Sequence, residues 1–407
     1  MDPIPTWVQR LWDTWDLRVL VLRSFTLQVI LSIFGGRRKH ISSLWINSVL
    51  VWSAYLMADW VATVALVKLS DAQGNQEKSN VLWAIWAPLL LLHLGSPDSI
   101  TAYSLEDNQL WMRHLMGLAV QIFVAIYVFL MSWKNSWFSF MSIPALVAGI
   151  IKYGERTWVL KSVSDDKYIH RIPFGSLKDK YPTEGHDYVR VLVVAHEHLK
   201  NFMEYLESEG SRGGYHWGNM ETSNILRYAL EVQMGLMSDL LYTKAAVIYN
   251  KRGFVMRCIS FGRTVSVLVG STIQIVILKT REEDDEESTW HEIDIAITGI
   301  LTVGALALEI YAAIVILSSN WGMLWLISQV EEPAHVQSRS RTLIRWVLGR
   351  NYEEIWNRYR HKTSCSVHPL RHQLSMEIAC RMFGGTGKAE EMGNNQTKVV
   401  DDATRNN

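Results

Sequence analysis

The sequence predicts an all-α membrane protein, a polytopic bundle of about seven transmembrane helices with amphipathic helices on its cytosolic side. Two observations carry this prediction. The 407 residues contain several long apolar runs, and a helix needs about 20 such residues to cross a hydrocarbon core roughly 30 Å thick. The chain also has 18 tryptophans, many of them at the edges of those runs, where the amphipathic ring prefers the headgroup layer.

The apolar runs give seven candidate spans of unequal strength. Those at 17–34 and 137–153 carry arginines or a proline, and 81–94 is the shortest. At 1.5 Å per residue this last run rises only about 21 Å, and Pro88 interrupts it, so it is either a short span or a re-entrant segment. The seven predicted spans are 17–34, 44–69, 81–94, 110–131, 137–153, 255–278 and 293–317.

The sequence divides into five regions. We expect an N-terminal membrane region with about five spans, a cytosolic helical insertion, a membrane region with two spans, a basic cytosolic helical segment and a disordered tail. Apolar residues at helical spacing in 187–208 and 222–248 predict two amphipathic helices in the insertion. The bounds of the five regions are 1–160, 161–250, 251–330, 331–383 and 384–407.

Lysine and arginine near the membrane ends predict the orientation, because their transfer across a membrane is disfavoured. With seven spans, the basic clusters after the first, fifth and seventh spans all fall on one side. We therefore expect an integral membrane protein with its N-terminus outside and its C-terminus in the cytosol, in a membrane that the sequence does not identify. The clusters are Arg37, Arg38 and Lys39; Lys152, Arg156 and Lys161; and Arg339, Arg341, Arg345 and Arg350.

The densest polar cluster lies between the third and fourth spans, in residues 92–115. Carboxylates flanked by imidazoles could bind a divalent cation or relay protons. A structural explanation is also available, because Gly95 and Pro97 stop one helix and Ser104 with Asp107 forms a capping box that starts the next. The candidate metal ligands are His93, Asp98, Glu106, Asp107 and His114.

Three ionisable residues lie inside the predicted spans, namely Asp59, Arg263 and Glu309. A charge at mid-bilayer is costly, so each should face the bundle interior and find a partner. We expect Arg263 and Glu309 to pair, because their helices are joined by a short loop and both lie about 12 Å from the same membrane face. Such a pair is either structural or part of a translocation or gating device.

Two other sets of possible metal ligands follow no standard zinc pattern. His196-Glu197-His198 lacks a histidine four residues after the first, so we interpret it as a solvated helix face. A second set near the C-terminus is interpreted as part of a basic membrane-facing segment. No phosphate loop, dinucleotide fingerprint or nucleophile elbow is present, and no cofactor is predicted. The second set is His361, Cys365, His368, His372 and Cys380.

Four segments resemble the plant membrane proteins that carry the domain of unknown function DUF4220. The likeness runs from about Leu11 to about Trp356. It implies a plant multi-spanning membrane protein of a family without an established activity, substrate or cofactor. Many relatives continue into a second domain, DUF594, which we expect to be missing from this chain. The four segments are YLMADWVATVAL (Tyr55–Leu66), WAPLLLLHLGSPDSITAYSLEDNQLWMRHL (Trp86–Leu115), KYGERTWVL (Lys152–Leu160) and LEVQMGLMSDLLYTKA (Leu230–Ala245).

These patterns together predict a non-enzymatic membrane protein, either a scaffold or a transport-related component. Its expected partners are the lipid bilayer and cytosolic proteins that dock on the amphipathic helices, with no nucleic acid. The alternative is a membrane-embedded metal-dependent enzyme that uses the cluster between His93 and His114. Stoichiometric metal in the purified protein would favour the enzyme, whereas a water-accessible cavity at Asp59 or Glu309 would favour a transporter.

Overall fold

The computed structural model describes residues 6–36, 46–74, 82–95, 98–133, 137–164, 174, 177, 187–207, 223–281 and 289–329. Every regular element within these ranges is a helix. The chain divides into two compact units, unit 1 with Met1–Tyr168 and Leu240–Ile316, and unit 2 with Ile169–Asp239 and Leu317–Asn407. The predicted basic segment 331–383, the predicted tail 384–407 and the set from His361 to Cys380 lie outside the described residues.

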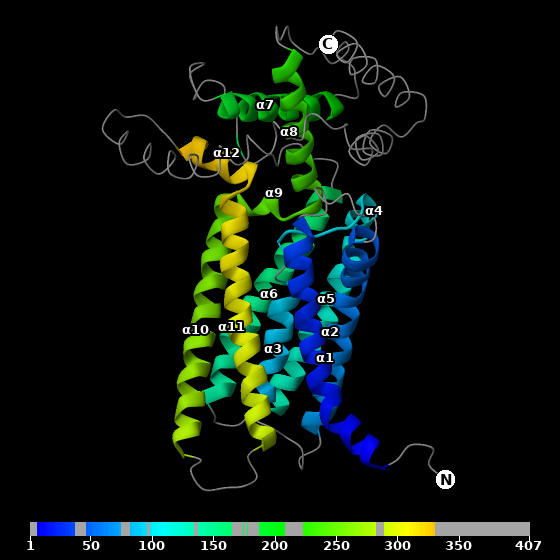
Figure 1. Ribbon diagram of the computed structural model, residues 1–407, viewed down its shortest axis with the longest axis vertical. Coiled ribbons are helices and arrows are strands. Elements are labelled where there is room, and N and C mark those ends of the chain that lie inside the picture. Colours follow the sequence, from blue (N-terminus) through cyan, green and yellow to red (C-terminus); the bar gives the residue numbers. More distant parts are fainter. Residues whose placement is uncertain are drawn as a thin grey trace, which may run out of the picture. The chain divides into compact units, whose positions relative to one another are not determined.

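Unit 1 is built from long helices that lie side by side (Figure 1). Its elements are α1 Thr6–Phe34, η2 Ile46–Val51, α2 Trp52–Gly74, α3 Trp83–Leu94, α4 Leu105–Gln109, α5 Trp111–Met131, α6 Trp137–Ser164, α9 Ala245–Ile248, α10 Lys251–Arg281 and α11 Thr289–Leu317. Five stretches among the described residues are long and apolar enough to cross a membrane by length and composition, and they match five predicted spans. These five are Trp15–Phe34, Val49–Gln73, Trp111–Met131, Arg252–Ile277 and Glu292–Leu317.

The other two predicted spans belong to helices of a different kind. The run 81–94 folds as α3, a helix of 12 residues, whose apolar part is shorter than the five candidate spans. The run 137–153 is the first part of α6, which is 28 residues long and continues through Glu155, Arg156 and Lys161. A count of seven crossings therefore stays a prediction, whereas helical structure with five candidate spans is established for the described residues.

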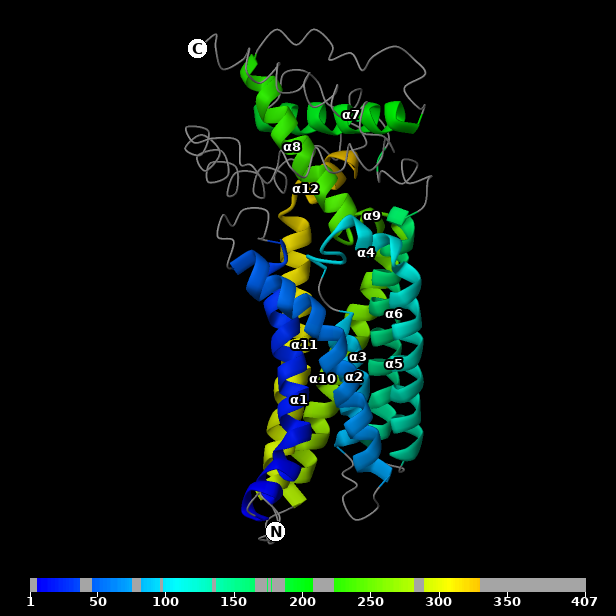
Figure 2. The ribbon, with the colours of Figure 1, turned by 90° about the vertical axis from the view of Figure 1, so that its right-hand side faces the viewer.

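Contacts near the helix ends fix the direction in which the helices of unit 1 run. Arg18 of α1 and Trp83 of α3 both contact Asp294, near the start of α11. Lys152, in the second half of α6, contacts Glu309, in the second half of α11. The helices α1, α3, α6 and α11 therefore run in the same direction along the bundle (Figures 1 and 2).

The remaining long helices of unit 1 run the other way. Asp59 in the first half of α2 lies against His114 at the start of α5 and Arg156 in the second half of α6. Arg257 near the start of α10 contacts Asp98, which follows the end of α3. With the short α3 included, the helices α1, α2, α3, α5, α6, α10 and α11 of unit 1 thus alternate in direction along the chain.

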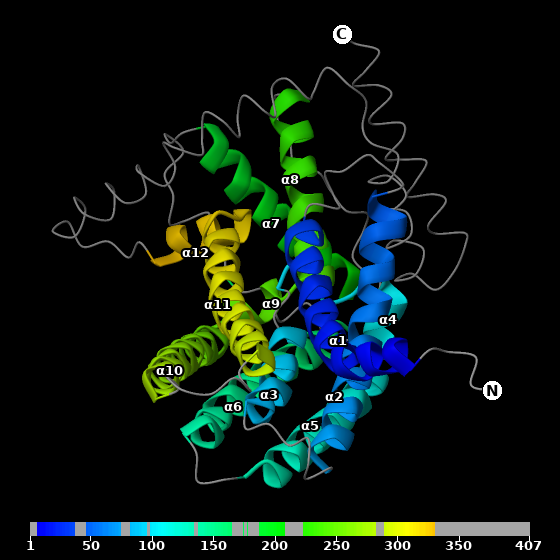
Figure 3. The same ribbon diagram turned by 60° about the horizontal axis from the view of Figure 1, so that its bottom comes forward.

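The short helix α3 is the centre of unit 1. It packs against α1, α2, α5 and α6, and Figure 3 shows it between these neighbours. Glycines let α6 and α3 approach closely, because a Cβ atom on Gly149 would lie 2.9 Å from the backbone nitrogen of Leu92, and one on Gly95 would lie 2.5 Å from that of Tyr153. Protein rather than lipid surrounds α3, so its length is not set by the thickness of a bilayer.

The outer faces of the long helices in unit 1 are strongly apolar. Phe123 and Leu130 of α5, Val255 of α10 and Ile314 of α11 expose between 56% and 80% of their surface. A continuous apolar surface of this kind is not stable in water and is typical of helices that contact lipid tails. The length, composition and surface of these helices are those of an integral membrane protein.

Unit 2 contains the predicted amphipathic helices of the insertion. They are confirmed as helices, α7 Asp187–Glu207 and α8 Ser223–Tyr242, although α8 ends six residues before the predicted bound of 248. A third helix, α12 Asn320–Gln329, packs against α7. The apolar stripe of α7 is buried, including Leu192, Ala195 and Leu199. The cytosolic location of these helices stays a prediction.

The interpretation of His196 as part of a solvated helix face is wrong. Its side chain is fully buried, and the ring lies 6.0 Å from that of Trp321 in α12 and 6.3 Å from that of Phe174. Neither ring nitrogen has a hydrogen-bond partner. His196 therefore occupies an aromatic contact between α7 and α12. The spacing in the sequence already placed it on the apolar face, because it lies four residues after Leu192 and three before Leu199.

We expect the stability of unit 2 to fall as the pH drops below about 6.5. Burial lowers the pKa of His196 from 6.5 to about 4, although the Glu197 carboxylate 3.9 Å away opposes the shift. The unfolded chain then binds a proton at a pH where the folded chain does not, so protonation favours unfolding. The loss should approach about 3 kcal/mol at pH 4, since one pKa unit corresponds to 1.36 kcal/mol.

Denaturant unfolding of the wild type and of His196→Phe between pH 4 and pH 8 would measure this effect. The variant keeps an aromatic ring against Trp321 but cannot be protonated there. The pH dependence of its free energy of unfolding therefore measures the contribution of all other groups. The difference between the two curves should be flat above pH 7 and should grow on acidification. A constant difference over the whole range would show that the histidine does not stay neutral in the folded protein.

Candidate functional site

A buried polar stripe runs along one face of α11. Asp294, Thr298, Thr302 and Glu309 recur at helical spacing, so they share a face, and each exposes 3% of its surface or less. The helix rises 1.5 Å per residue, so the stripe is roughly 22 Å long. Polar groups buried over such a length of an apolar helix are costly unless they find partners, and α1, α3 and α6 supply them.

At the start of α11 the partner is a buried ion pair. The Nε atom of Arg18 lies 2.7 Å from Oδ1 of Asp294, and the indole nitrogen of Trp83 donates to Oδ2 of the same carboxylate at 3.2 Å. One turn further on, the indole nitrogen of Trp86 donates to the hydroxyl of Thr298 at 2.9 Å. Two tryptophans of the central helix α3 therefore hydrogen-bond to the stripe.

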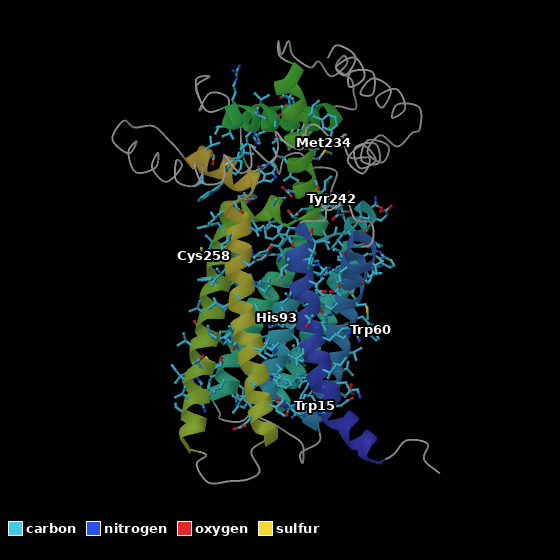
Figure 4. All side chains as sticks on the ribbon, viewed as in Figure 1. Trp15, Trp60, His93, Met234, Tyr242 and Cys258 are labelled. Atoms are coloured by element: carbon cyan, nitrogen blue, oxygen red, sulfur yellow. The ribbon has the colours of Figure 1, made fainter. Side chains whose placement is uncertain are left out.

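His93 of α3 lies beside the middle of the stripe, inside the bundle (Figure 4). Its Nδ1 is 2.6 Å from the carbonyl oxygen of Leu89, and its Nε2 is 3.1 Å from that of Leu301 in α11. The ring also packs edge-on against Phe25 of α1. A neutral imidazole has a single N–H donor and the imidazolium has two. Only the protonated ring can therefore donate to both carbonyls.

Towards the end of α11 the stripe joins a cluster of six buried charges, which we call the charged cluster. It contains three cations and three carboxylates, so its formal charge is balanced. Nζ of Lys152 lies 2.5 Å from Oε1 of Glu309. Lys152 exposes 1% of its surface and Glu309 3%, which makes this a pair removed from solvent. The members are Asp98, Lys152, Glu155, Lys244, Arg257 and Glu309.

Lys244 is the central cation of the charged cluster. Its Nζ lies 3.1 Å from Asp98 and 3.8 Å from Glu155, and it donates to the carbonyl oxygen of Gly95 at 2.7 Å and to that of Lys152 at 3.3 Å. Arg257 also contacts both carboxylates, through Nη1 at 2.9 Å from Asp98 and 3.9 Å from Glu155. Burial lowers the pKa of the Lys244 ammonium to about 8, against the opposing effect of Glu155.

Backbone contacts hold Lys244 in this position. The amide of Thr101 donates to the carbonyl of Tyr242 at 2.8 Å, and the amide of Lys244 donates to that of Asp98 at 3.4 Å. The side-chain amide of Asn108 donates to the carbonyl of Leu241 at 3.2 Å. The turn between α8 and α9 is therefore fastened to the connection that follows α3, and together they cover one end of the polar stripe.

A second polar cluster joins α2, α5 and α6, and we call it the Asp59 cluster. Nη1 of Arg156 lies 3.2 Å from Oδ1 of Asp59, and Nδ1 of His114 lies 3.8 Å from its Oδ2. The guanidinium group is also 5.6 Å from the ring centroid of Tyr55 and 5.8 Å from that of Tyr153. Arg156 is thus enclosed by two aromatic rings and neutralised by one carboxylate.

Comparison with known proteins identifies the family. The model of the family described as "Domain of unknown function (DUF4220)" matches residues 52–229 and 218–364, which is more than half of the chain. The chain belongs to the DUF4220 family. No curated protein and no solved structure matches it. The matched residues of this DUF4220 protein contain the charged cluster and the Asp59 cluster, and Arg18 precedes them.

The five candidate metal ligands of the DUF4220 protein are not gathered in one place. His93 lies beside α11, Asp98 belongs to the charged cluster and His114 to the Asp59 cluster. Asp107 accepts hydrogen bonds from the backbone amides of Tyr103 and Ser104, at 2.9 and 3.0 Å, and Glu106 is its neighbour in α4. Within the described ranges no group of three histidine, cysteine, aspartate or glutamate residues is placed to hold a metal ion.

The predicted capping box is present, but it starts a different helix. Ser104 and Asp107 cap α4, a helix of five residues that ends before α5 begins at Trp111. The acidic side chain therefore caps the start of a short helix and not that of a candidate span. Of the five candidate ligands, Asp107 is the one for which the sequence predicted a helix-capping role, and its observed contacts are those of a cap.

The predicted pair of Arg263 and Glu309 is wrong. The partner of Glu309 is Lys152 of α6, and the other cations near its carboxylate are Arg257 and Lys244. Arg263 is only half-buried on α10 and is not a member of the charged cluster. The prediction assumed that helices joined by a short loop share their charges, whereas α10 packs against α6.

Two residues counted for the orientation of the chain have a different role in the structure. Lys152 and Arg156 each expose 6% of their surface or less and form ion pairs inside unit 1. Of that basic cluster only Lys161 is exposed. The predicted orientation therefore rests on fewer solvent-facing cations than the sequence suggests, and it stays a prediction.

Proposed function

We propose that this DUF4220 protein is a transport-related membrane protein that conducts protons through unit 1, along the polar stripe of α11. The observation that carries the proposal is the position of His93. An imidazole placed between two backbone carbonyls, and flanked along α11 by a carboxylate on either side, is a group that can accept and release a proton within an otherwise apolar bundle. Chains of ionisable groups inside membrane bundles are typical of proton relays.

The size of the conducted species follows from the packing of the stripe. Asp294 and Thr298 contact partners on α1 and α3 at hydrogen-bond distances of 2.7 to 3.2 Å, and α3 is packed tightly against α6. A solute larger than a proton would have to separate these helices. Proton transfer between neighbouring groups requires only that hydrogen bonds rearrange, which favours protons over larger ions.

The proposed topology has seven crossings, with the N-terminus outside and the C-terminus in the cytosol. The alternating direction of seven helices of unit 1, the short α3 included, supports it. In this topology the charged cluster lies towards the cytosolic end of the path, and the pair of Arg18 and Asp294 towards the outer end. The amphipathic helices of unit 2 then lie on the cytosolic side, where we propose that they dock protein partners.

Proton flux into liposomes would test the proposal. Purified protein is reconstituted with a pH-sensitive dye inside, and a potassium gradient with valinomycin drives protons inward. Liposomes with the wild type should acidify faster than protein-free liposomes, and His93→Phe should return the rate to that background. Thr272→Val is the matched control, because it removes a hydroxyl from the exposed face of α10 and should leave the flux unchanged.

Two outcomes would contradict this function. A wild-type rate equal to that of protein-free liposomes would mean that the stripe conducts nothing and only joins helices, as expected for a scaffold. Flux that His93→Phe leaves intact would mean that protons take a route that avoids α3. Circular dichroism and size-exclusion chromatography of each variant would establish that it is folded before the rates are compared.

A further inference from the structure

The Asp59 cluster contains buried polar atoms that the protein itself does not satisfy. His114 and Arg156 expose 7% and 6% of their surface, yet Nε2 of His114 and Nε of Arg156 have no hydrogen-bond partner. A buried polar atom without a partner costs free energy comparable to a lost hydrogen bond. Two such atoms in one cluster point to a partner group from outside the chain.

The chemistry of that group follows from the two atoms. Nδ1 of His114 faces the carboxylate of Asp59, so the proton of the neutral ring is assigned to Nδ1 and Nε2 is left as an acceptor. The Nε–H of Arg156 is a donor. A hydroxyl group both donates and accepts, so it offers what each of the two atoms lacks.

The charge of the site argues against an ionic ligand. The carboxylate of Asp59 and the guanidinium of Arg156 neutralise each other at 3.2 Å. A phosphate or an ammonium group would have to break this pair or add an unbalanced charge next to it, which is costly in a low-dielectric site. An uncharged hydroxyl adds hydrogen bonds without disturbing the pair.

The site opens sideways, onto the apolar surface of the bundle. The side chain of Asp59 is 30% exposed, and the exposed residues around it are apolar. Trp60, on the adjacent position of α2, is 61% exposed and lies at the outer surface in Figure 4. On α5, Met112 and Met116 are 53% and 61% exposed. A ligand whose hydroxyl occupies the site would lay the rest of its body against these side chains.

We propose that Asp59, His114 and Arg156 form a binding site for the hydroxyl group of an uncharged amphiphilic lipid. Sterols and diacylglycerols share this chemistry, with one free hydroxyl on an apolar body. The apolar part packs along the outer faces of α2 and α5, which contact each other. The site is separate from the stripe of α11, so the proposal does not depend on proton conduction.

Photoreactive lipids in reconstituted vesicles would test the proposal. Three probes are compared at equal mole fraction: a sterol with a free 3-hydroxyl, a diacylglycerol, and a phosphatidylcholine, which has a charged headgroup and no free hydroxyl. The hydroxyl probes should label peptides from 52–74 and 111–131, and unlabelled lipid of the same class should compete. The relative labelling by the sterol and the diacylglycerol identifies the natural source of the hydroxyl.

Two variants connect the labelling to the site. His114→Phe replaces the acceptor by an apolar ring, so specific labelling should fall to the level of the phosphatidylcholine probe. Arg113→Gln changes the adjacent exposed cation and should leave labelling unchanged. If His114→Phe is not folded, His114→Asn, which is smaller and polar, provides the same comparison through the affinity for competing lipid.

Three results would overturn the proposal. Equal labelling by all three probes would mean that α2 and α5 have only an ordinary lipid annulus. Selective labelling that His114→Phe does not reduce would place the lipid elsewhere on the bundle. An absence of competable labelling would mean that His114 Nε2 and Arg156 Nε are satisfied by water only.

Discussion

Replacing Lys152 or Glu309 alone with methionine should lower the free energy of unfolding by about 3–5 kcal/mol, whereas replacing both should be nearly neutral. The two side chains form a buried pair with Nζ and Oε1 2.5 Å apart. Either single change leaves the other charge in a low-dielectric interior, and the double change removes both charges at once. Thermal unfolding in detergent, followed by tryptophan fluorescence, would measure the four proteins of this cycle.

Arg263 provides the matched control for that cycle. It lies on a candidate membrane span, as Glu309 does, but it is not in the charged cluster. Arg263→Leu should therefore cost less than Lys152→Met and should not rescue Glu309→Met. Rescue of Glu309→Met by Arg263→Leu would restore the pairing that the sequence predicted. A double mutant of Lys152 and Glu309 that loses the sum of the two single effects would show that these residues are not energetically coupled.

Lys244→Met should be as destabilising as the loss of either member of the Lys152 and Glu309 pair, by about 3–5 kcal/mol. The ammonium is fully buried, contacts Asp98 and Glu155, and satisfies the carbonyl of Gly95. Without it, Arg257 alone faces two carboxylates. Thermal unfolding would give the magnitude, and hydrogen exchange should become faster in residues 98–110 and 240–248, whose backbone contacts the lysine fastens.

Lys161→Met is the control for charge alone. This exposed lysine lies 5.1 Å from the ring of Trp111, a contact worth about 0.5–1 kcal/mol at an exposed site. Its loss should leave exchange in 240–248 unchanged. If Lys161→Met and Lys244→Met prove equally mild, the charged cluster is hydrated and open, and the buried position of Lys244 does not describe the protein in solution.

The membrane class and five of the spans could be predicted because an uninterrupted apolar run of about 20 residues has few other physical explanations. The central helix was harder to interpret. The criterion of about 20 apolar residues applies to a helix that crosses lipid, whereas α3 is surrounded by protein. Its apolar composition therefore predicted a helix correctly, but whether that helix crosses the membrane stayed undecided. The close approach of α3 and α6 at Gly149 and Gly95 could not be predicted, because it depends on which helix packs against each glycine.

The charged cluster was predicted only in part, because a buried charge is recognisable in a sequence only when apolar residues surround it. Glu309 stands out in an apolar run, but Lys152 lies where a basic residue at a membrane end is expected, and Lys244 lies in a polar segment. Neither gives a local signal of burial. One signal was available, since Asp98, Lys152, Glu155 and Lys244 all lie in the segments that resemble the DUF4220 family.

The partners in these ion pairs are far apart in the sequence, and this has a consequence for how the protein is made. Arg18 precedes Asp294 by 276 residues, and Asp98 precedes Arg257 by 159. At about 5–20 residues per second, a ribosome needs roughly 10–55 seconds to supply the missing partner. During that interval Arg18 and Asp98 lack these partners of the folded protein. The last two helices of unit 1, α10 and α11, therefore supply Arg257 and Asp294 as partners for charges that entered the membrane region much earlier.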